Sequence, residues 1–107
     1  MGKLHPAIEF FKQVLEKEPH VVISRYHLGV AYARLGKFSE AIEEFEKFLK
    51  EVPASAAALY NLGKAYYNKG DVDKAITAFQ KAVEIDPEDE RSKKNLLMLE
   101  DLKSRFF

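Results

Sequence analysis

The stretch that decides the fold runs from Ala56 to Asp89 and reads AAALYNLGKAYYNKGDVDKAITAFQKAVEIDPED. It indicates two short helices separated by a turn at Lys69-Gly70-Asp71, where glycine and aspartate interrupt the helical pattern of apolar residues. Six residue types recur 34 residues upstream. The upstream copies are Leu28, Gly29, Tyr32, Ala41, Phe45 and Pro53, and the downstream copies are Leu62, Gly63, Tyr66, Ala75, Phe79 and Pro87.

A 34-residue period with this pattern resembles the tetratricopeptide repeat (TPR), a helix-turn-helix unit whose copies stack into a solenoid. The resemblance implies an all-α fold, an antiparallel helix-hairpin solenoid. The chain is expected to contain the second helix of a partial repeat, two full repeats and a C-terminal capping helix. A single TPR domain is predicted over residues 1–107, with a half repeat at 3–21, repeats at 22–55 and 56–89, and the capping helix at 90–107.

Several residues carry specific local expectations. Gly36 is expected to end a helix as a left-handed cap, and Ser55 to cap the start of the next repeat. Gly29 and Ala41 are expected where the two helices of the first hairpin approach most closely, because neither has a large side chain. The capping helix is expected to cover the last hairpin with Leu96, Met98, Leu99 and Leu102.

Composition limits the classes of function. The chain has 107 residues, of which 47% are hydrophobic, and its 17 basic residues equal its 17 acidic ones. No overall charge draws it to nucleic acid or to an anionic membrane, so neither is expected as a partner. No stretch is long and apolar enough to predict a signal peptide or a transmembrane segment, and a cytoplasmic location is the default expectation.

The sequence offers little for catalysis. There is no cysteine, and His5, His20 and His27 are not at the spacing of metal ligands. No serine has an evident base nearby in the sequence pattern. We therefore expect no enzymatic activity, no cofactor and no metal.

The resemblance instead implies peptide binding, because in this family the first helices of the repeats line a concave groove that holds a peptide of a partner protein. The implied groove residues are Ile23, Tyr26, His27, Val30, Arg34, Tyr60, Asn61, Lys64, Tyr67, Asn68, Arg91, Lys94, Asn95 and Met98. Four of them are cations and none is acidic, which leads to the hypothesis that the peptide is acidic.

Some family members hold the C-terminal Glu-Glu-Val-Asp of heat-shock chaperones with a two-carboxylate clamp. Asn61 and Arg91 match two of its five positions, whereas Tyr26, Val30 and Asn95 depart from it. This particular ligand is therefore not expected.

An alternative function is self-association into a homodimer or a larger homo-oligomer. If the N-terminal helix has one uncovered flank, apolar side chains on it could contact a second copy. The residues expected on that flank are Ile8, Phe11 and Leu15.

Overall fold

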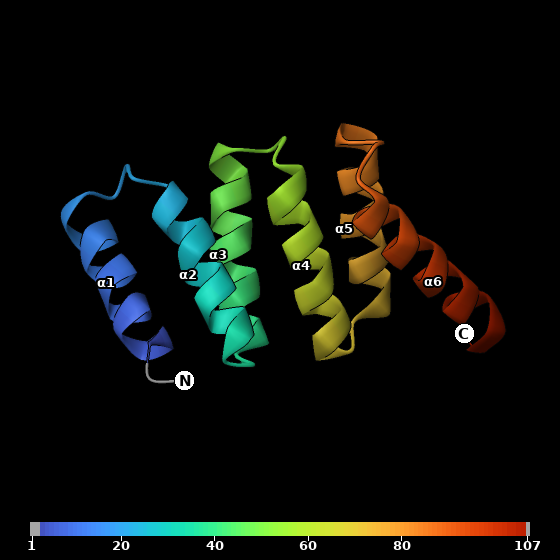
Figure 1. The fold of residues 1–107 in the computed structure, drawn as a ribbon, viewed down its shortest axis with the longest axis horizontal. Coiled ribbons are helices and arrows are strands. Elements are labelled where there is room, and N and C mark those ends of the chain that lie inside the picture. Colours follow the sequence, from blue (N-terminus) through green and yellow to red (C-terminus); the bar gives the residue numbers. More distant parts are fainter. Residues whose placement is uncertain (1–2, 107) are drawn as a thin grey trace. The chain divides into compact units, whose positions relative to one another are not determined.

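A computed structural model describes residues 3–106, and over these residues the chain forms six α-helices and no strand (Figure 1). The helices are α1 (Leu4–Lys17), α2 (Ile23–Arg34), α3 (Phe38–Glu51), α4 (Ala56–Lys69), α5 (Val72–Ile85) and α6 (Glu90–Phe106). Residues 1, 2 and 107 of the predicted domain lie outside the described part of the chain.

The chain divides into two compact units, Met1–Pro53 and Ala54–Phe107. In the first unit α1 packs on α2 and α2 packs on α3; in the second, α4 packs on α5 and α5 packs on α6. Within each unit successive helices run antiparallel (Figure 1). The sequence-based prediction of one continuous domain remains a prediction.

In the first unit, the apolar stripe of α1 faces α2. Ile8 is buried in a cluster with Leu28 and Ala31, and Phe11 and Leu15 pack half-buried against it. Ile8, Phe11 and Leu15 were expected to be uncovered, and this expectation is wrong. The three residues share one face of the helix at i, i+3 and i+7 spacing, and α2 covers that face.

A different side chain of α1 is exposed. Phe10 leaves 60% of its surface accessible, although its ring meets that of Phe11 edge-on with centroids 5.4 Å apart. On α1, Phe10 is thus the exposed large apolar side chain, whereas Ile8, Phe11 and Leu15 are packed against α2.

In the second unit, α6 covers α5. Leu99 is buried in one cluster with Ala75, Ile76 and Phe79, and the half-buried Leu96 and Leu102 pack on it. These three leucines of α6 thus cover the hairpin as expected. Met98 does not, because it lies one position from Leu99 around the helix and remains 51% exposed.

A glycine in each full hairpin makes room for a phenylalanine ring. A Cβ atom added to Gly29 would lie 2.7 Å from Cε1 of Phe45, and one added to Gly63 would lie 2.8 Å from Cε1 of Phe79. Both distances are shorter than real Cβ contacts allow, and both rings are buried. The close approach expected at Gly29 is therefore filled by the ring of Phe45, one turn after Ala41.

Turns and caps follow the local expectations. Gly36 and Gly70 have φ of 76° and 93°, the left-handed conformation that glycine adopts without strain. The Ser55 Oγ accepts a hydrogen bond of 3.2 Å from the Ala58 N–H, which confirms Ser55 as an N-cap.

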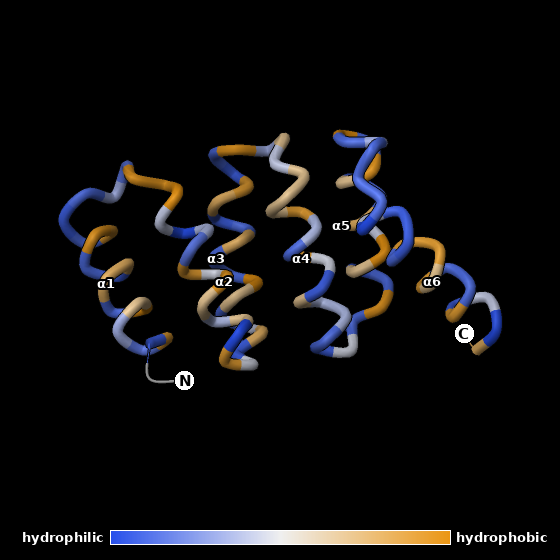
Figure 2. The backbone as a smooth tube through the Cα atoms, viewed as in Figure 1, coloured by the Kyte–Doolittle hydropathy of each residue, from blue (hydrophilic) through white to orange (hydrophobic). Residues whose placement is uncertain are grey.

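Apolar positions are interspersed with polar ones along the helices (Figure 2). Within residues 3–106, every helix falls short of the length and hydrophobicity that crossing a bilayer requires.

Candidate functional site

A cavity of about 290 Å³ opens in the second unit, where α4 and α6 both adjoin α5. It is lined by Tyr60, Lys64, Tyr67, Asn68, Phe79, Asn95, Met98 and Leu99. Five of the eight are large apolar or aromatic side chains without charge, Lys64 is the only charged residue among them, and no acidic residue contributes to the lining.

The apolar part of the cavity has a rigid floor and adaptable walls. Phe79 and Leu99 belong to the core of this unit and are each 1% exposed, so they are fixed by their own packing. Tyr67 is 43% exposed and Met98 is 51% exposed. Exposed aromatic and methionine side chains beside a hollow are typical of binding surfaces.

Two cations lie against the ring of Tyr60. The guanidinium carbon of Arg91 is 4.3 Å from the ring centroid, and Nζ of Lys64 is 5.1 Å from it. Both distances lie within the range in which a cation is attracted to the quadrupole of an aromatic ring. Tyr60 thus gathers positive charge from α4 and from α6 beside the cavity.

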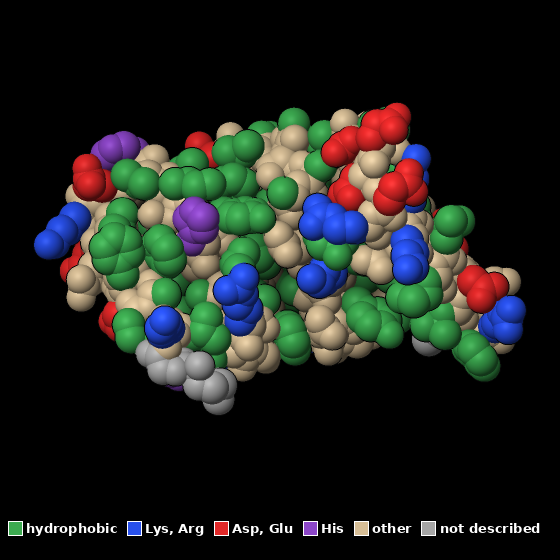
Figure 3. Space-filling view, viewed as in Figure 1, with side chains coloured by type: hydrophobic (Ala, Val, Ile, Leu, Met, Phe, Trp, Pro, Cys, Tyr) green, Lys and Arg blue, Asp and Glu red, His purple; other side chains and the backbone are tan. Residues whose placement is uncertain are grey.

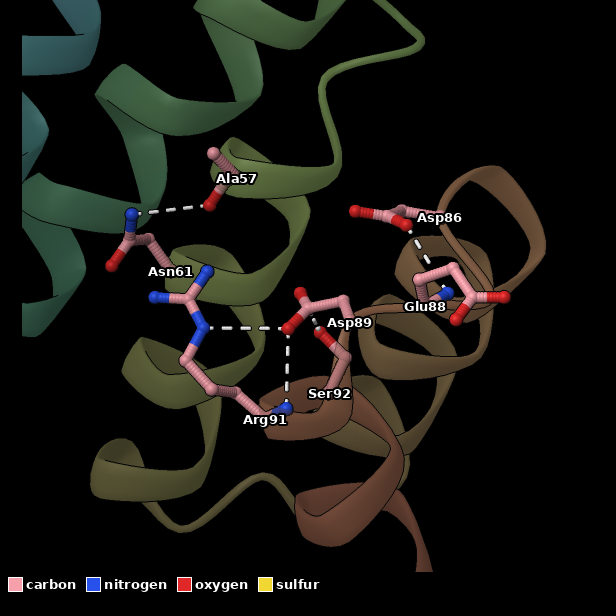
Figure 4. A network of polar contacts seen from close by, with 7 residues as sticks. All are labelled: Ala57, Asn61, Asp86, Glu88, Asp89, Arg91 and Ser92. Carbon is pink, nitrogen blue, oxygen red and sulfur yellow. Dashed lines mark hydrogen bonds and ion pairs between the residues drawn. The ribbon is translucent and has the colours of Figure 1, made fainter.

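Arg91 is held in place by the residue that caps α6 (Figure 4). Oδ1 of Asp89 accepts a hydrogen bond of 3.1 Å from the Arg91 N–H and one of 3.3 Å from its Nε, while Oδ2 accepts one of 3.0 Å from the Ser92 hydroxyl. Burial of the carboxylate acts to raise the pKa of Asp89, but the hydrogen bonds from Ser92 and Arg91 together lower that pKa below its usual value.

The remaining cations of the predicted site are not neutralised. Among residues 3–106, neither Lys64 nor Lys94 forms an ion pair with a carboxylate. Figure 3 shows basic side chains gathered over α4 and the first half of α6, and acidic side chains grouped where α5 ends and α6 begins. On the face shown, basic and acidic side chains of this unit thus form separate groups.

Most predicted site residues of α4 and α6 come together. Tyr60, Lys64, Tyr67, Asn68, Asn95 and Met98 line the cavity. Arg91 lies on Tyr60, and Lys94 is exposed on α6. The Asn61 amide donates a hydrogen bond of 3.1 Å to the Ala57 carbonyl within α4 (Figure 4).

The sequence reading missed Phe79 and Leu99 as part of the site. Their periodicity marks them as core, and they are core residues, but one side of each also forms the floor of the cavity. No local signal distinguishes a core residue that borders a cavity from one that does not.

The five predicted residues of α2 belong to the first unit. Ile23, His27 and Arg34 are exposed, and Val30 is half-buried. Tyr26 packs toward α3, with its ring centroid 5.9 Å from that of Phe45 and 5.5 Å from that of Phe48. Its ring is therefore largely engaged in packing. The prediction of one groove shared by α2, α4 and α6 stays a prediction.

His27 also has an aromatic neighbour. Its ring stacks on that of Phe11 at 5.3 Å between centroids and 20° between planes.

In the part of the chain that is described, no group of three or more His, Cys, Asp or Glu side chains could hold a metal ion.

A larger hollow of about 430 Å³ lies at the turn between α4 and α5. Its charged groups largely pair with one another: Lys103 Nζ lies 2.6 Å from Asp73 Oδ1, and Lys74 Nζ lies 4.0 Å from Asp71 Oδ2. Because its charges are satisfied internally, this hollow is a weaker candidate than the cavity between α4 and α6.

Comparison with known proteins identifies the fold. The family model described as tetratricopeptide repeat matches residues 1–53 and 31–90. Among solved structures, MamA 41-end from Desulfovibrio magneticus RS-1 is 30% identical, with a TM-score of 0.89 over 96% of this chain and 58% of the other. This chain therefore spans less than two thirds of the MamA chain. Comparison with curated proteins gives no significant match.

Two less similar structures share the fold. The first TPR of Spaghetti (RPAP3), bound to the HSP90 peptide SRMEEVD, is 18% identical, with a TM-score of 0.91 over 96% of this chain and 82% of the other. The Sgt2 TPR domain from Aspergillus fumigatus is 23% identical, with a TM-score of 0.86 over 96% and 70%. These likenesses confirm the predicted all-α helix-hairpin solenoid class. The chain belongs to the tetratricopeptide repeat family.

Proposed function

We propose that this chain is a non-catalytic scaffold that binds an acidic peptide segment of another protein at the cavity between α4 and α6. The observation that carries the proposal is the pairing of an apolar cavity with cations, of which Lys64 and Lys94 form no ion pair within residues 3–106 while Arg91 pairs with Asp89. Lys64 lines the cavity, Arg91 lies against Tyr60, and Lys94 is exposed on the same helix as Arg91. Charge-assisted hydrogen bonds from these groups favour carboxylates.

Two amide side chains support peptide binding in particular. Asn68 and Asn95 line the cavity, and within residues 3–106 neither has a side-chain hydrogen-bond partner. A side-chain amide both donates and accepts, so it can pair with the N–H and C=O of an extended peptide. A partner that supplies backbone groups as well as carboxylates would satisfy the whole rim of the cavity.

The structure of Spaghetti supports the general function, because in it a TPR of the same fold is bound to the acidic peptide SRMEEVD. The identity of 18% is too low to carry over the ligand. Three of the five clamp positions differ here, and the Asn61 amide donates to the Ala57 carbonyl. The proposed ligand is therefore acidic without being the chaperone tail, and SRMEEVD serves as a comparison peptide.

Selection from a random 12-residue displayed peptide library on the immobilised full chain tests the proposal. We expect enrichment of sequences rich in Asp and Glu. Their binding should weaken steeply with salt and with Lys64→Gln combined with Arg91→Gln. The control pair is Lys81→Gln with Arg105→Gln, which removes two exposed cations that do not line the cavity.

The outcomes separate the parts of the proposal. Enrichment of neutral or basic sequences would overturn the acidic ligand but keep peptide binding. A library that yields no binder above background would overturn peptide binding itself.

Self-association is a second candidate, supported by the exposure of Phe10 on α1. Light scattering over a range of protein concentrations tests it. A dimer that weakens with Phe10→Glu but not with Gln13→Glu, an exposed position on the same helix, supports it. A monomer at all concentrations rules it out.

A further inference from the structure

We infer that the cavity between α4 and α6 takes one large apolar side chain of the bound peptide, and that an acidic residue within two positions of it pairs with Lys64. The recognised segment is therefore a mixed apolar and acidic motif, not a run of acidic residues. This inference rests on the proposed function and specifies the partner for the same site.

The chemistry of the lining requires an apolar occupant. The floor consists of Phe79 and Leu99, and Tyr60, Tyr67 and Met98 provide further apolar surface. A carboxylate placed on such a floor would lose its hydration without gaining a partner there, because the floor offers no donor. An apolar side chain in the same place gains free energy from the surface it removes from water.

The size of the cavity suits one large side chain. Sites for cofactors and other small molecules usually enclose about 300–1,000 Å³. The cavity of about 290 Å³ lies just below this range. Small pockets of this kind receive single anchor residues in protein interfaces, where a few buried aromatic or aliphatic side chains carry most of the affinity.

The position of Lys64 sets the spacing of the motif. Lys64 lines the cavity, and its Nζ lies 5.1 Å from the Tyr60 ring centroid, so the ammonium group stands at the edge of the apolar surface. Consecutive Cα atoms of a peptide are 3.8 Å apart. Because Lys64 itself lines the cavity, we place the carboxylate that pairs with this ammonium on a residue one or two positions from the one that fills the cavity.

The wall at Met98 predicts which anchors are accepted. Methionine has three rotatable bonds and adapts to occupants of different shape. Met98 is 51% exposed and lines the cavity together with Tyr67. We therefore expect Leu, Met and Phe anchors to bind with similar affinity, and Ala anchors to bind much more weakly.

The neighbouring Leu97 provides a matched control. It is 67% exposed on the same helix and does not line the cavity. Met98→Ala removes a wall of the proposed pocket, whereas Leu97→Ala removes a similar amount of exposed apolar surface beside it.

The experiment uses peptides enriched from the random 12-residue library and measures their affinities by fluorescence anisotropy on the full chain. We expect each clone to carry Leu, Met or Phe within two positions of Asp or Glu. Replacing that anchor by Ala should weaken binding by at least about fivefold. The same peptide change should weaken binding less in the Met98→Ala protein, because the contact between the anchor and Met98 is already lost there. In the Leu97→Ala protein it should weaken binding as much as in the wild type.

Each outcome decides the inference. Enrichment of acidic peptides that lack an apolar anchor overturns the inference and leaves the proposed function standing. So does an anchor→Ala change that weakens binding equally in the wild type and in Met98→Ala. Apolar peptides that bind without a nearby Asp or Glu overturn its acidic half together with the acidic ligand. Failure to obtain any binder overturns both the inference and the proposed function.

Discussion

The Arg91 guanidinium of α6 lies 4.3 Å from the centroid of the Tyr60 ring of α4. This contact joins two helices that both pack on α5, and it places a cation beside the cavity. The Nε of the same guanidinium also donates a hydrogen bond to Asp89. The ring of Tyr60 and the carboxylate of Asp89 therefore both hold Arg91 in position.

The contact makes Arg91 a stability determinant as well as a proposed ligand contact. Arg91→Gln removes the ion pair with Asp89 and the contact with Tyr60, so it should lower the free energy of unfolding by about 0.5–1 kcal/mol more than Arg105→Gln does, the usual value of an exposed cation–π interaction. Arg105→Gln is the control, because Arg105 is similarly exposed on α6 but pairs only with Asp101 one turn away, which is worth about 0.3–0.5 kcal/mol. Urea denaturation of both variants measures the difference, and equal losses would contradict a special role for Tyr60.

Gly63 should not tolerate even the smallest side chain. In an open helix Gly→Ala is stabilising by up to about 1 kcal/mol. Here the new Cβ would lie 2.8 Å from the buried Phe79 ring, so we expect a net loss of about 1–3 kcal/mol in urea denaturation. Combining Gly63→Ala with Phe79→Leu should cost less than the sum of the single changes, because the smaller side chain relieves the clash. Strict additivity would rule out the ring as the cause.

Asp89 should stabilise α6 as an N-cap whose contribution depends on pH. Asp89→Ala removes the acceptor for the Arg91 N–H and should cost about 1 kcal/mol at pH 7. Because the pKa of Asp89 is lower in the folded state than in the unfolded chain, its contribution is full above the unfolded value of about 3.9 and is lost as pH falls through the folded pKa.

The difference in unfolding free energy between the wild type and Asp89→Ala should therefore shrink as pH falls from about 5 to about 2, roughly the range in which a carboxylate with a lowered pKa becomes protonated. Asp89→Asn serves as the control, since its amide oxygen can still cap the helix but carries no charge. A difference that is constant with pH would show that the charge of Asp89 contributes nothing to the cap.

Two adjacent phenylalanines of α1 should differ in how strongly a charge at their position destabilises the protein. Phe11→Glu places a carboxylate against the cluster around Ile8 and should destabilise the first unit by at least about 2 kcal/mol. Phe10→Glu alters a side chain that is largely in water and should change stability by no more than about 0.5 kcal/mol. Thermal denaturation followed by circular dichroism distinguishes them, and similar losses would contradict the assigned faces of α1.

The sequence by itself determined the helices and their pairing into hairpins. Gly29 and Phe45 recur as Gly63 and Phe79. Each pair fixes which faces of the two helices in its hairpin pack together, because the phenylalanine ring needs the space that the glycine leaves. The caps at Gly36 and Ser55 were likewise predictable, since they depend on the conformation or hydrogen bonding of a few neighbouring residues.

Only the tertiary structure decided which side chains are covered and which enclose a cavity. Periodicity shows that α1 has an apolar stripe, but α2 decides that Phe11 is packed and Phe10 is left in water. The same holds for Met98 and Leu99, adjacent in sequence, of which one forms a wall and the other a floor. Burial and cavities depend on residues distant in sequence, so the pattern of one helix cannot specify them.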